Sequence, residues 1–166
     1  MIELAPGWVV EVDDSTRNHW VGRCGDIGMI FAYEGSHNDV RHVRAMMTCC
    51  EQLGRQAKTG ARILFVVPPL HAKPPDQQVR HVLVQGMRKY ELQIARLALV
   101  IAGTGFGAAI HRGVATGLLT IVRPKFRVKI ESDVGEGLSF LLDRDSAAFL
   151  PLLRYCQARA MGPLAE

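Results

Sequence analysis

The sequence predicts an α/β protein in which an antiparallel meander of strands leads into alternating strands and helices. Three observations predict this class. Short strand-like segments with brief turn-type connections open the chain, and helical patterns of period 3.6 follow. Two uninterrupted apolar runs, at 61–67 and 95–102, are typical of parallel strands covered on both faces. The 166-residue length fits one domain over residues 1–166, with a core at 8–160 and a frayed tail at 161–166.

The first strands are expected in a region where turn-type residues separate apolar segments. The segments are "WVVEV" (8–12), "HWVGRC" (19–24) and "GMIFAY" (28–33), and the connections read "DDSTRN" and "GDIG". Connections of only a few residues join strands that pair antiparallel. We therefore expect a three-stranded meander at this end of the sheet.

A long helix is expected next, with Ser36 and Asn38 as N-cap candidates and Gly60 as its stop signal. The pattern has an apolar face and an opposite charged face. The apolar face carries Val40, Val43, Met47, Cys50 and Ala57, and the charged face carries Arg41, Arg44, Glu51, Arg55 and Lys58.

The remaining elements alternate between strands and helices. After the strand at 61–67 and a Pro-rich loop at 68–75, we expect a helix from Pro75 or Asp76, a strand at 95–102, a helix at 106–120, a strand at 126–131, and helices at 134–142 and 146–160, the last capped by Asp145. The helix at 106–120 is expected to turn inward Phe106, Ile110, Val114 and Leu118. Right-handed crossovers would lay these helices over a mixed sheet.

Composition and charge favour a cytoplasmic protein. The net charge of +4 is spread along the chain, without a basic run or aromatic–basic interleaving, so nucleic-acid binding is not predicted. No apolar stretch approaches the roughly 20 residues that cross a bilayer. The start "MIELAPGWVVEV" has no signal-type core. Four cysteines without C-x-x-C spacing indicate reduced thiols.

A glycine-rich turn within "LALVIAGTGFGAAIHRG" (97–113) is the best candidate for a ligand contact. Its G-x-G-x-x-A spacing between a strand and a helix suits a pyrophosphate, and Glu131 ends the next strand, where a ribose-binding acid would lie. Only about sixty residues follow the turn, too few for a full βαβαβ half. We interpret it as a packed turn that marks a contact for a partner or an anion and implies no cofactor. The candidate residues are Gly103, Thr104, Gly105 and Gly107, reinforced by His111 and Arg112.

Catalytic signals are absent from the sequence. There is no G-x-S-x-G, and none of the six histidines has H-x-x-x-H spacing, so we expect neither a catalytic residue nor a metal site. We therefore favour a binding module over an enzyme. A surface for an acidic partner is predicted on the first helix, at Arg41, Arg44, Arg55 and Lys58. Open sheet edges would also allow a homodimer.

Residues 111–141, "HRGVATGLLTIVRPKFRVKIESDVGEGLSFL", carry a family resemblance. They resemble a stretch of bacterial SpoIIAA-like (STAS-like) proteins, in which a helix with a basic start precedes a strand and an acidic "eeAl-WL"-type helix. Gly137 replaces the small alanine, and Phe140 replaces the usual tryptophan. The other matching positions are Asp133, Glu136, Leu138 and Leu141. The order of elements over residues 8–142 also resembles this fold.

The resemblance implies a non-enzymatic regulatory or scaffolding module that acts in bacterial signalling by protein–protein interaction. In anti-sigma-factor antagonists of this type, a D-S-[ST]-G turn carries a phosphorylated serine. The corresponding stretch here, "VVPPLHAKPPDQQ", has no serine or threonine, so that switch is not expected. The alternative is a small-ligand, anion or nucleotide-binding protein using the turn at 103–108. Lipid binding would need a large apolar cavity, for which the short chain offers little room.

Overall fold

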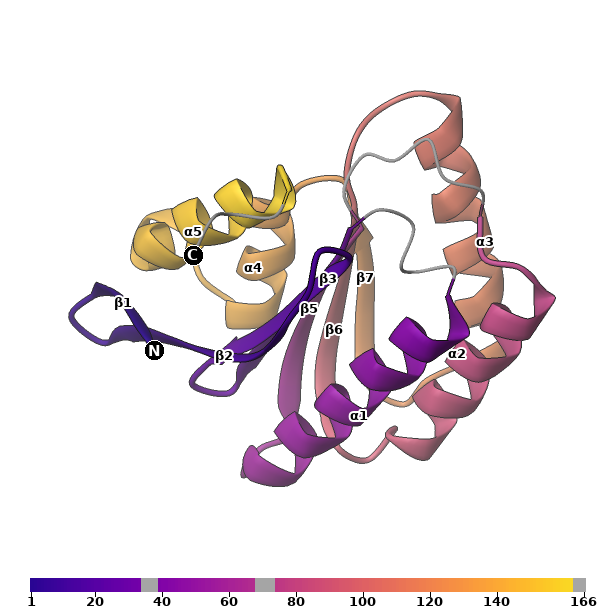
Figure 1. The fold of residues 1–166 in the computed structure, drawn as a ribbon, viewed down its shortest axis with the longest axis horizontal. Helices are drawn as coiled ribbons and strands as arrows, with labels where there is room; N and C mark the ends of the chain where they lie inside the picture. The colour runs from indigo at the N-terminus through magenta and orange to yellow at the C-terminus, as the bar shows by residue number, and fades with distance from the viewer. Residues whose placement is uncertain (34–38, 68–73, 163–166) are drawn as a thin grey trace.

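The computed structural model of the protein describes residues 1–33, 39–67 and 74–162. Within these residues, a mixed sheet of seven strands is flanked by five α-helices. The strands lie in the sheet in chain order, β1 to β7 (Figure 1). The pairings from β1 to β4 are antiparallel, and those from β4 to β7 are parallel. The predicted α/β class, with an antiparallel start followed by βα units, is confirmed.

The antiparallel part is larger than the sequence predicted. It comprises β1 (Ile2–Ala5), β2 (Trp8–Ser15), β3 (His19–Cys24) and β4 (Ile27–Ala32). Strand β1 was not predicted, and β2 continues into the segment that we expected to turn. The acidic residues of this extension have partners on β3, since Asp14 lies 2.7 Å from His19 Nε2 and Asp13 lies 3.9 Å from Arg23. These contacts allow two acidic residues to stay in a strand.

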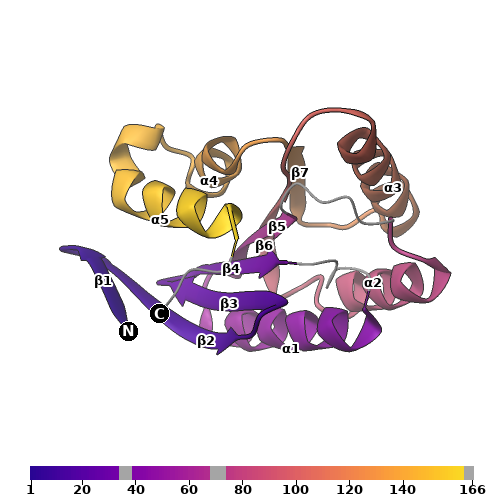
Figure 2. The same ribbon diagram turned by 45° about the horizontal axis from the view of Figure 1, so that its top comes forward.

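The parallel part alternates β5 (Ala61–Val67), β6 (Ile94–Ile101) and β7 (Arg127–Glu131) with the helices α1 (Val40–Gln56), α2 (Gln77–Lys89) and α3 (Phe106–Val122). Neighbouring strands in the chain are also neighbours in the sheet, so crossovers of one hand place all three helices on one face. The other face is covered by α4 (Val134–Leu142) and α5 (Leu150–Ala160), as Figure 2 shows.

Aspartates cap several helices at their N-termini. Asp39 accepts a hydrogen bond from the backbone N–H of Arg41, and Asp76 from that of Val79. The predicted caps Ser36 and Asn38 lie outside the described residues. The expected helix at 146–160 is divided into a 3₁₀ turn (Ser146–Phe149), capped by Asp145, and α5. Pro151 explains the division, because a proline can begin an α-helix but cannot donate a hydrogen bond inside one.

The largest core cluster lies between the sheet and α4–α5. Trp20 and Phe31 meet edge to face at 5.7 Å between ring centroids, and both are fully buried.

On the other face of the sheet, the side chain of Phe106 was expected to point inward, but it is 83% exposed. This expectation is wrong because Phe106 begins α3, ahead of the turns that reach the sheet. The residues of α3 that are buried are His111, Ala115 and Leu118.

A buried tyrosine makes the stability sensitive to high pH. Tyr33 donates a hydrogen bond to the carbonyl oxygen of Arg159 at 2.9 Å, and burial raises the pKa of its phenol to about 12. The unfolded chain ionises Tyr33 near pH 10, before the folded protein does, so the contribution of Tyr33 to stability is complete below pH 10 and declines above it. We expect the free energy of unfolding, measured by urea denaturation between pH 8 and 11.5, to fall more steeply in the wild type than in Tyr33→Phe. Equal slopes would contradict this assignment.

Candidate functional site

The glycine-rich turn connects β6 to α3, as the sequence predicted. Gly103 and Gly105 adopt φ values of 91° and 99°, a region that side chains rarely occupy. A Cβ on Gly105 would meet nothing within 4 Å, so the backbone conformation, not close packing, requires glycine there. Gly105 is the N-cap of α3, and no side chain caps this helix. The first N–H groups of α3 therefore receive no side-chain cap, and such groups at a helix N-terminus attract anions in general.

Arg112 and His111, which were expected to attract an anion to this turn, instead form hydrogen bonds with backbone carbonyl groups in or next to it. Arg112 donates hydrogen bonds to the carbonyl oxygens of Ile101 at 3.1 Å and Gly103 at 3.3 Å. His111 is buried, and its Nδ1 bonds the carbonyl oxygen of Gly107 at 2.9 Å. Since a carbonyl only accepts, that ring nitrogen carries the proton. These contacts stabilise the connection between strand and helix.

Glu131, which lies where the nucleotide-binding alternative would place a ribose-binding acid, belongs to another local network. Its carboxylate lies 2.5 Å from Lys129 Nζ. A hydrogen bond with Glu131, together with its negative charge, raises the pKa of Glu136 on α4. Asp133 caps the same helix. Glu131 thus serves the junction between β7 and α4, and its carboxylate is engaged by neighbouring side chains.

The predicted basic face of α1 is divided by local ion pairs. Arg41 lies 3.1 Å from its own N-cap, Asp39, and Arg55 pairs with Glu51 one turn earlier. Arg44 is exposed near the start of the helix, whereas Lys58 follows the end of α1. Two of the four predicted cations, Arg41 and Arg55, are therefore paired with nearby carboxylates. Lys58 instead belongs to a group of cations to which other segments contribute.

This group lies at the amino-terminal ends of the parallel strands, where the turns after α1, α2 and α3 meet (Figure 1). Helices α1 and α2 begin with aspartate caps at the opposite end of the sheet, and basic residues follow in or after the last turns of α1, α2 and α3. Acidic residues at the N-terminus of a helix and basic residues at its C-terminus both interact favourably with the helix dipole. No ion pair joins the following exposed cations to a carboxylate in the described part of the chain, and we call them the basic end: Lys58, Arg88, Arg123, Arg127 and Arg144.

Three arginines also meet at this end, which the sequence did not reveal. Arg62 on β5 is in register with Arg96 on β6, which is in register with Arg127 on β7. Arg62 lies 3.4 Å from Asp26, and Arg96 pairs with Asp143 and lowers the pKa of that carboxyl. Two carboxylates thus accompany three guanidinium groups. Their alignment depends on strand register, so no local sequence signal could have identified it.

The thiols and histidines show no catalytic arrangement in the described part of the chain. Cys24, Cys50 and Cys156 are buried and Cys49 is half-buried, all four as free thiols. Burial raises the pKa of Cys50 to about 12, so it remains a neutral thiol at physiological pH. Within the described ranges, no group of three or more histidine, cysteine, aspartate or glutamate side chains is placed to hold a metal. The loop histidine His71 lies outside those ranges.

Comparison with protein-family models, with curated proteins and with solved structures finds no match for this chain. Among the helices that the structure describes, none has the length and apolar character to cross a membrane.

Proposed function

We propose that this protein is a non-enzymatic regulatory or scaffolding module of SpoIIAA-like (STAS-like) type, which binds an acidic segment of a protein partner at the basic end in a bacterial cytoplasm. The observation that carries the proposal is the basic end itself. Five exposed cations from five separate segments meet at one end of the sheet. Such a concentration of charge attracts and orients an acidic partner.

An exposed leucine favours a protein partner over a nucleic acid. Leu92 lies in the turn between α2 and β6, at the basic end, and it is 89% exposed. A protein segment can satisfy both features, because it can place acidic side chains against the cations and an apolar side chain against Leu92. The stretch that would carry the serine switch of anti-sigma-factor antagonists includes residues 68–73, which are outside the described residues. Its lack of serine and threonine means that this partner would be bound without that phosphorylation.

Two variants of equal charge change test the proposal. Lys58→Glu/Arg144→Glu reverses two cations at the basic end, and Arg44→Glu/Arg154→Glu reverses two exposed cations elsewhere. Each tagged protein would be cross-linked in extract of its source cells, and the captured proteins would be quantified by mass spectrometry. We expect the wild type and the second variant to capture the same acidic protein. The first variant should capture it at least tenfold less, and rising salt should weaken capture because the contact is electrostatic.

Three results would contradict the proposed function. Equal capture by both variants would exclude the basic end as the contact surface. Capture of nucleic acid in place of protein would exclude the partner class, and recovery of no partner by the wild type would exclude an interaction module. Circular dichroism of both variants checks that neither substitution unfolds the chain.

A further inference from the structure

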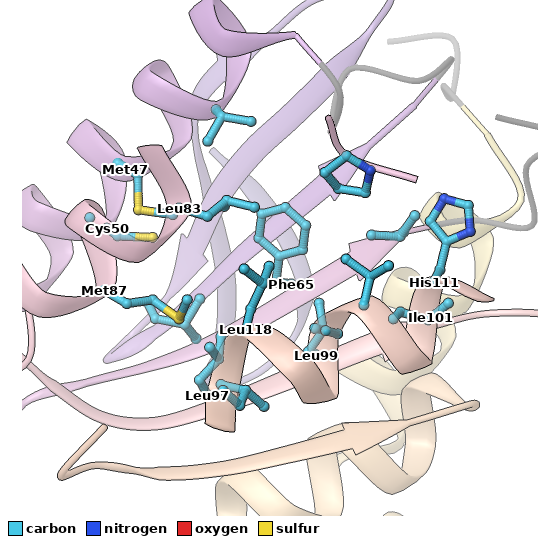
Figure 3. Close-up of a pocket in the computed structure, with 18 of the residues that line it drawn as sticks. Met47, Cys50, Phe65, Leu83, Met87, Leu97, Leu99, Ile101, His111 and Leu118 are labelled. Carbon is cyan, nitrogen blue, oxygen red and sulfur yellow. The ribbon is translucent and has the colours of Figure 1, made fainter. Parts of the chain in front are cut away.

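An apolar cavity lies beneath the three helices that cover one face of the sheet (Figure 3). Its volume is about 130 Å³, and its walls come from β5, β6, α1, α2 and α3. The side chains of Phe65, Leu83 and Leu118 line it from three different elements. Short residues help to leave this space open, since Gly86 on α2 and Ala115 on α3 also line it. We expected the short chain to have little room for a large lipid cavity. The cavity that is present has the size of a small molecule.

The cavity divides the core on this face. One buried cluster lies beneath α1 and α2 and includes Met46 and Ile63, and a separate cluster beneath α3 includes Ile101 and Ala115. The central strands show the same effect. The side chains on the α4 side are fully buried at Leu64, Val66, Ala98 and Val100. On the cavity side, Phe65, Leu97 and Leu99 are only half-buried, although Ile63, Val67 and Ile101 on the same strands are buried.

The chemistry of the wall selects an apolar ligand. Nearly all of the lining surface is carbon and sulfur, and the thioethers of Met47 and Met87 can adapt to an occupant. Cys50 contributes a neutral thiol. His111 is the one basic side chain among the described lining residues, and its Nδ1 already donates to the Gly107 carbonyl. Burying an unpaired charge is costly, so an uncharged occupant fits this wall best.

We propose that the cavity binds a small uncharged apolar molecule, either a single aromatic ring or a short alkyl chain. Protein interiors rarely contain voids much larger than a water molecule. A dry cavity of about 150 Å³ lined by leucine, isoleucine and phenylalanine binds benzene, so this cavity is suited to an occupant of about six carbon atoms. The site is separate from the basic end and does not depend on a protein partner.

Toluene, cyclohexane and benzoate are the probes for a first test on the wild-type protein. Methyl ¹H–¹³C spectra and melting temperatures would be recorded with each compound. We expect toluene and cyclohexane to shift the methyl resonances of Leu83, Leu99 and Leu118, to leave that of exposed Leu92 unchanged, and to raise the melting temperature. Benzoate, which has nearly the size of toluene but carries a charge, should do neither.

Two variants on the same helix provide the second test. Leu118→Trp places an indole in the cavity, whereas Ile121→Trp places one on the exposed face of α3, where Ile121 is 62% exposed. We expect toluene affinity to fall at least tenfold in Leu118→Trp and to be unchanged in Ile121→Trp. The proposal is overturned if toluene shifts no lining methyl at its solubility limit, if benzoate binds as tightly, or if Leu118→Trp binds toluene like the wild type. Should Leu118→Trp fail to fold, the wild-type spectra still decide the question.

Discussion

Phe149→Ala is expected to lower the free energy of unfolding by about 3–5 kcal/mol, the usual loss when a buried aromatic ring is deleted. Phe149 is fully buried at the end of the 3₁₀ turn that precedes α5. It belongs to the cluster that joins the sheet to α4 and α5, together with Trp20 and Leu138. Alanine would leave a void among side chains that the sheet and two helices hold in place, so the surroundings could collapse only partly.

Phe106→Ala is the matched control, because it deletes the same side chain from an exposed position. Phe106 is 83% exposed at the start of α3, and its removal should change the free energy of unfolding by no more than about 0.5 kcal/mol. Urea denaturation followed by circular dichroism measures both variants. A similar loss in the two variants would contradict the placement of these rings.

Gly137→Leu should destabilise the protein by about 1–3 kcal/mol, because α4 lies too close to the sheet for a side chain at this position. A Cβ on Gly137 would come within 2.8 Å of Val100 Cγ2 and 3.1 Å of Leu64 Cδ1. Both neighbours are fully buried, so neither can move away freely. Urea denaturation at neutral pH would measure the loss. The close approach of α4 to the sheet therefore gives a packing reason for glycine at position 137.

Gly113→Ala is the control for this second prediction, since it adds a methyl group to a helical glycine with open surroundings. Gly113 lies inside α3, and a Cβ there would meet nothing within 4 Å. Alanine should raise the free energy of unfolding by about 0.5–1 kcal/mol through its greater helix propensity. A loss of stability in Gly113→Ala would contradict the open surroundings of this position.

The two faces of the sheet are therefore packed to different degrees. On one face, α4 approaches so closely that it needs a glycine, whereas on the other face three helices and the sheet line a partly open cavity of about 130 Å³. At about 24 cal/mol per Å³, a closed and empty cavity of this volume would cost on the order of 3 kcal/mol. An apolar occupant would recover part of that loss. This contrast explains why we place a ligand on the α1–α3 face and a structural role on the α4 face.

Much of the fold follows from the local sequence pattern. The apolar runs predicted the parallel strands β5 and β6, and the pattern at 134–142 predicted α4 with its observed bounds. These predictions succeed because strand and helix periodicity depends on which side chains a local segment buries. Strand β1 was missed, and so was the end of β2, where Asp13 and Asp14 lie beside Arg23 and His19 of the neighbouring strand.

The sequence by itself determined the class of the fold, the order of its central elements and the glycine-rich connection between β6 and α3. Only the tertiary structure decided which chemical groups come together. It places the Arg112 guanidinium against the carbonyls of that connection, aligns Arg62 with Arg96 and Arg127, and brings five exposed cations to one end of the sheet. It also left the cavity beneath α1–α3. The physical reason is that strand register and helix packing bring together residues that are far apart in the chain. A local sequence pattern does not predict those contacts.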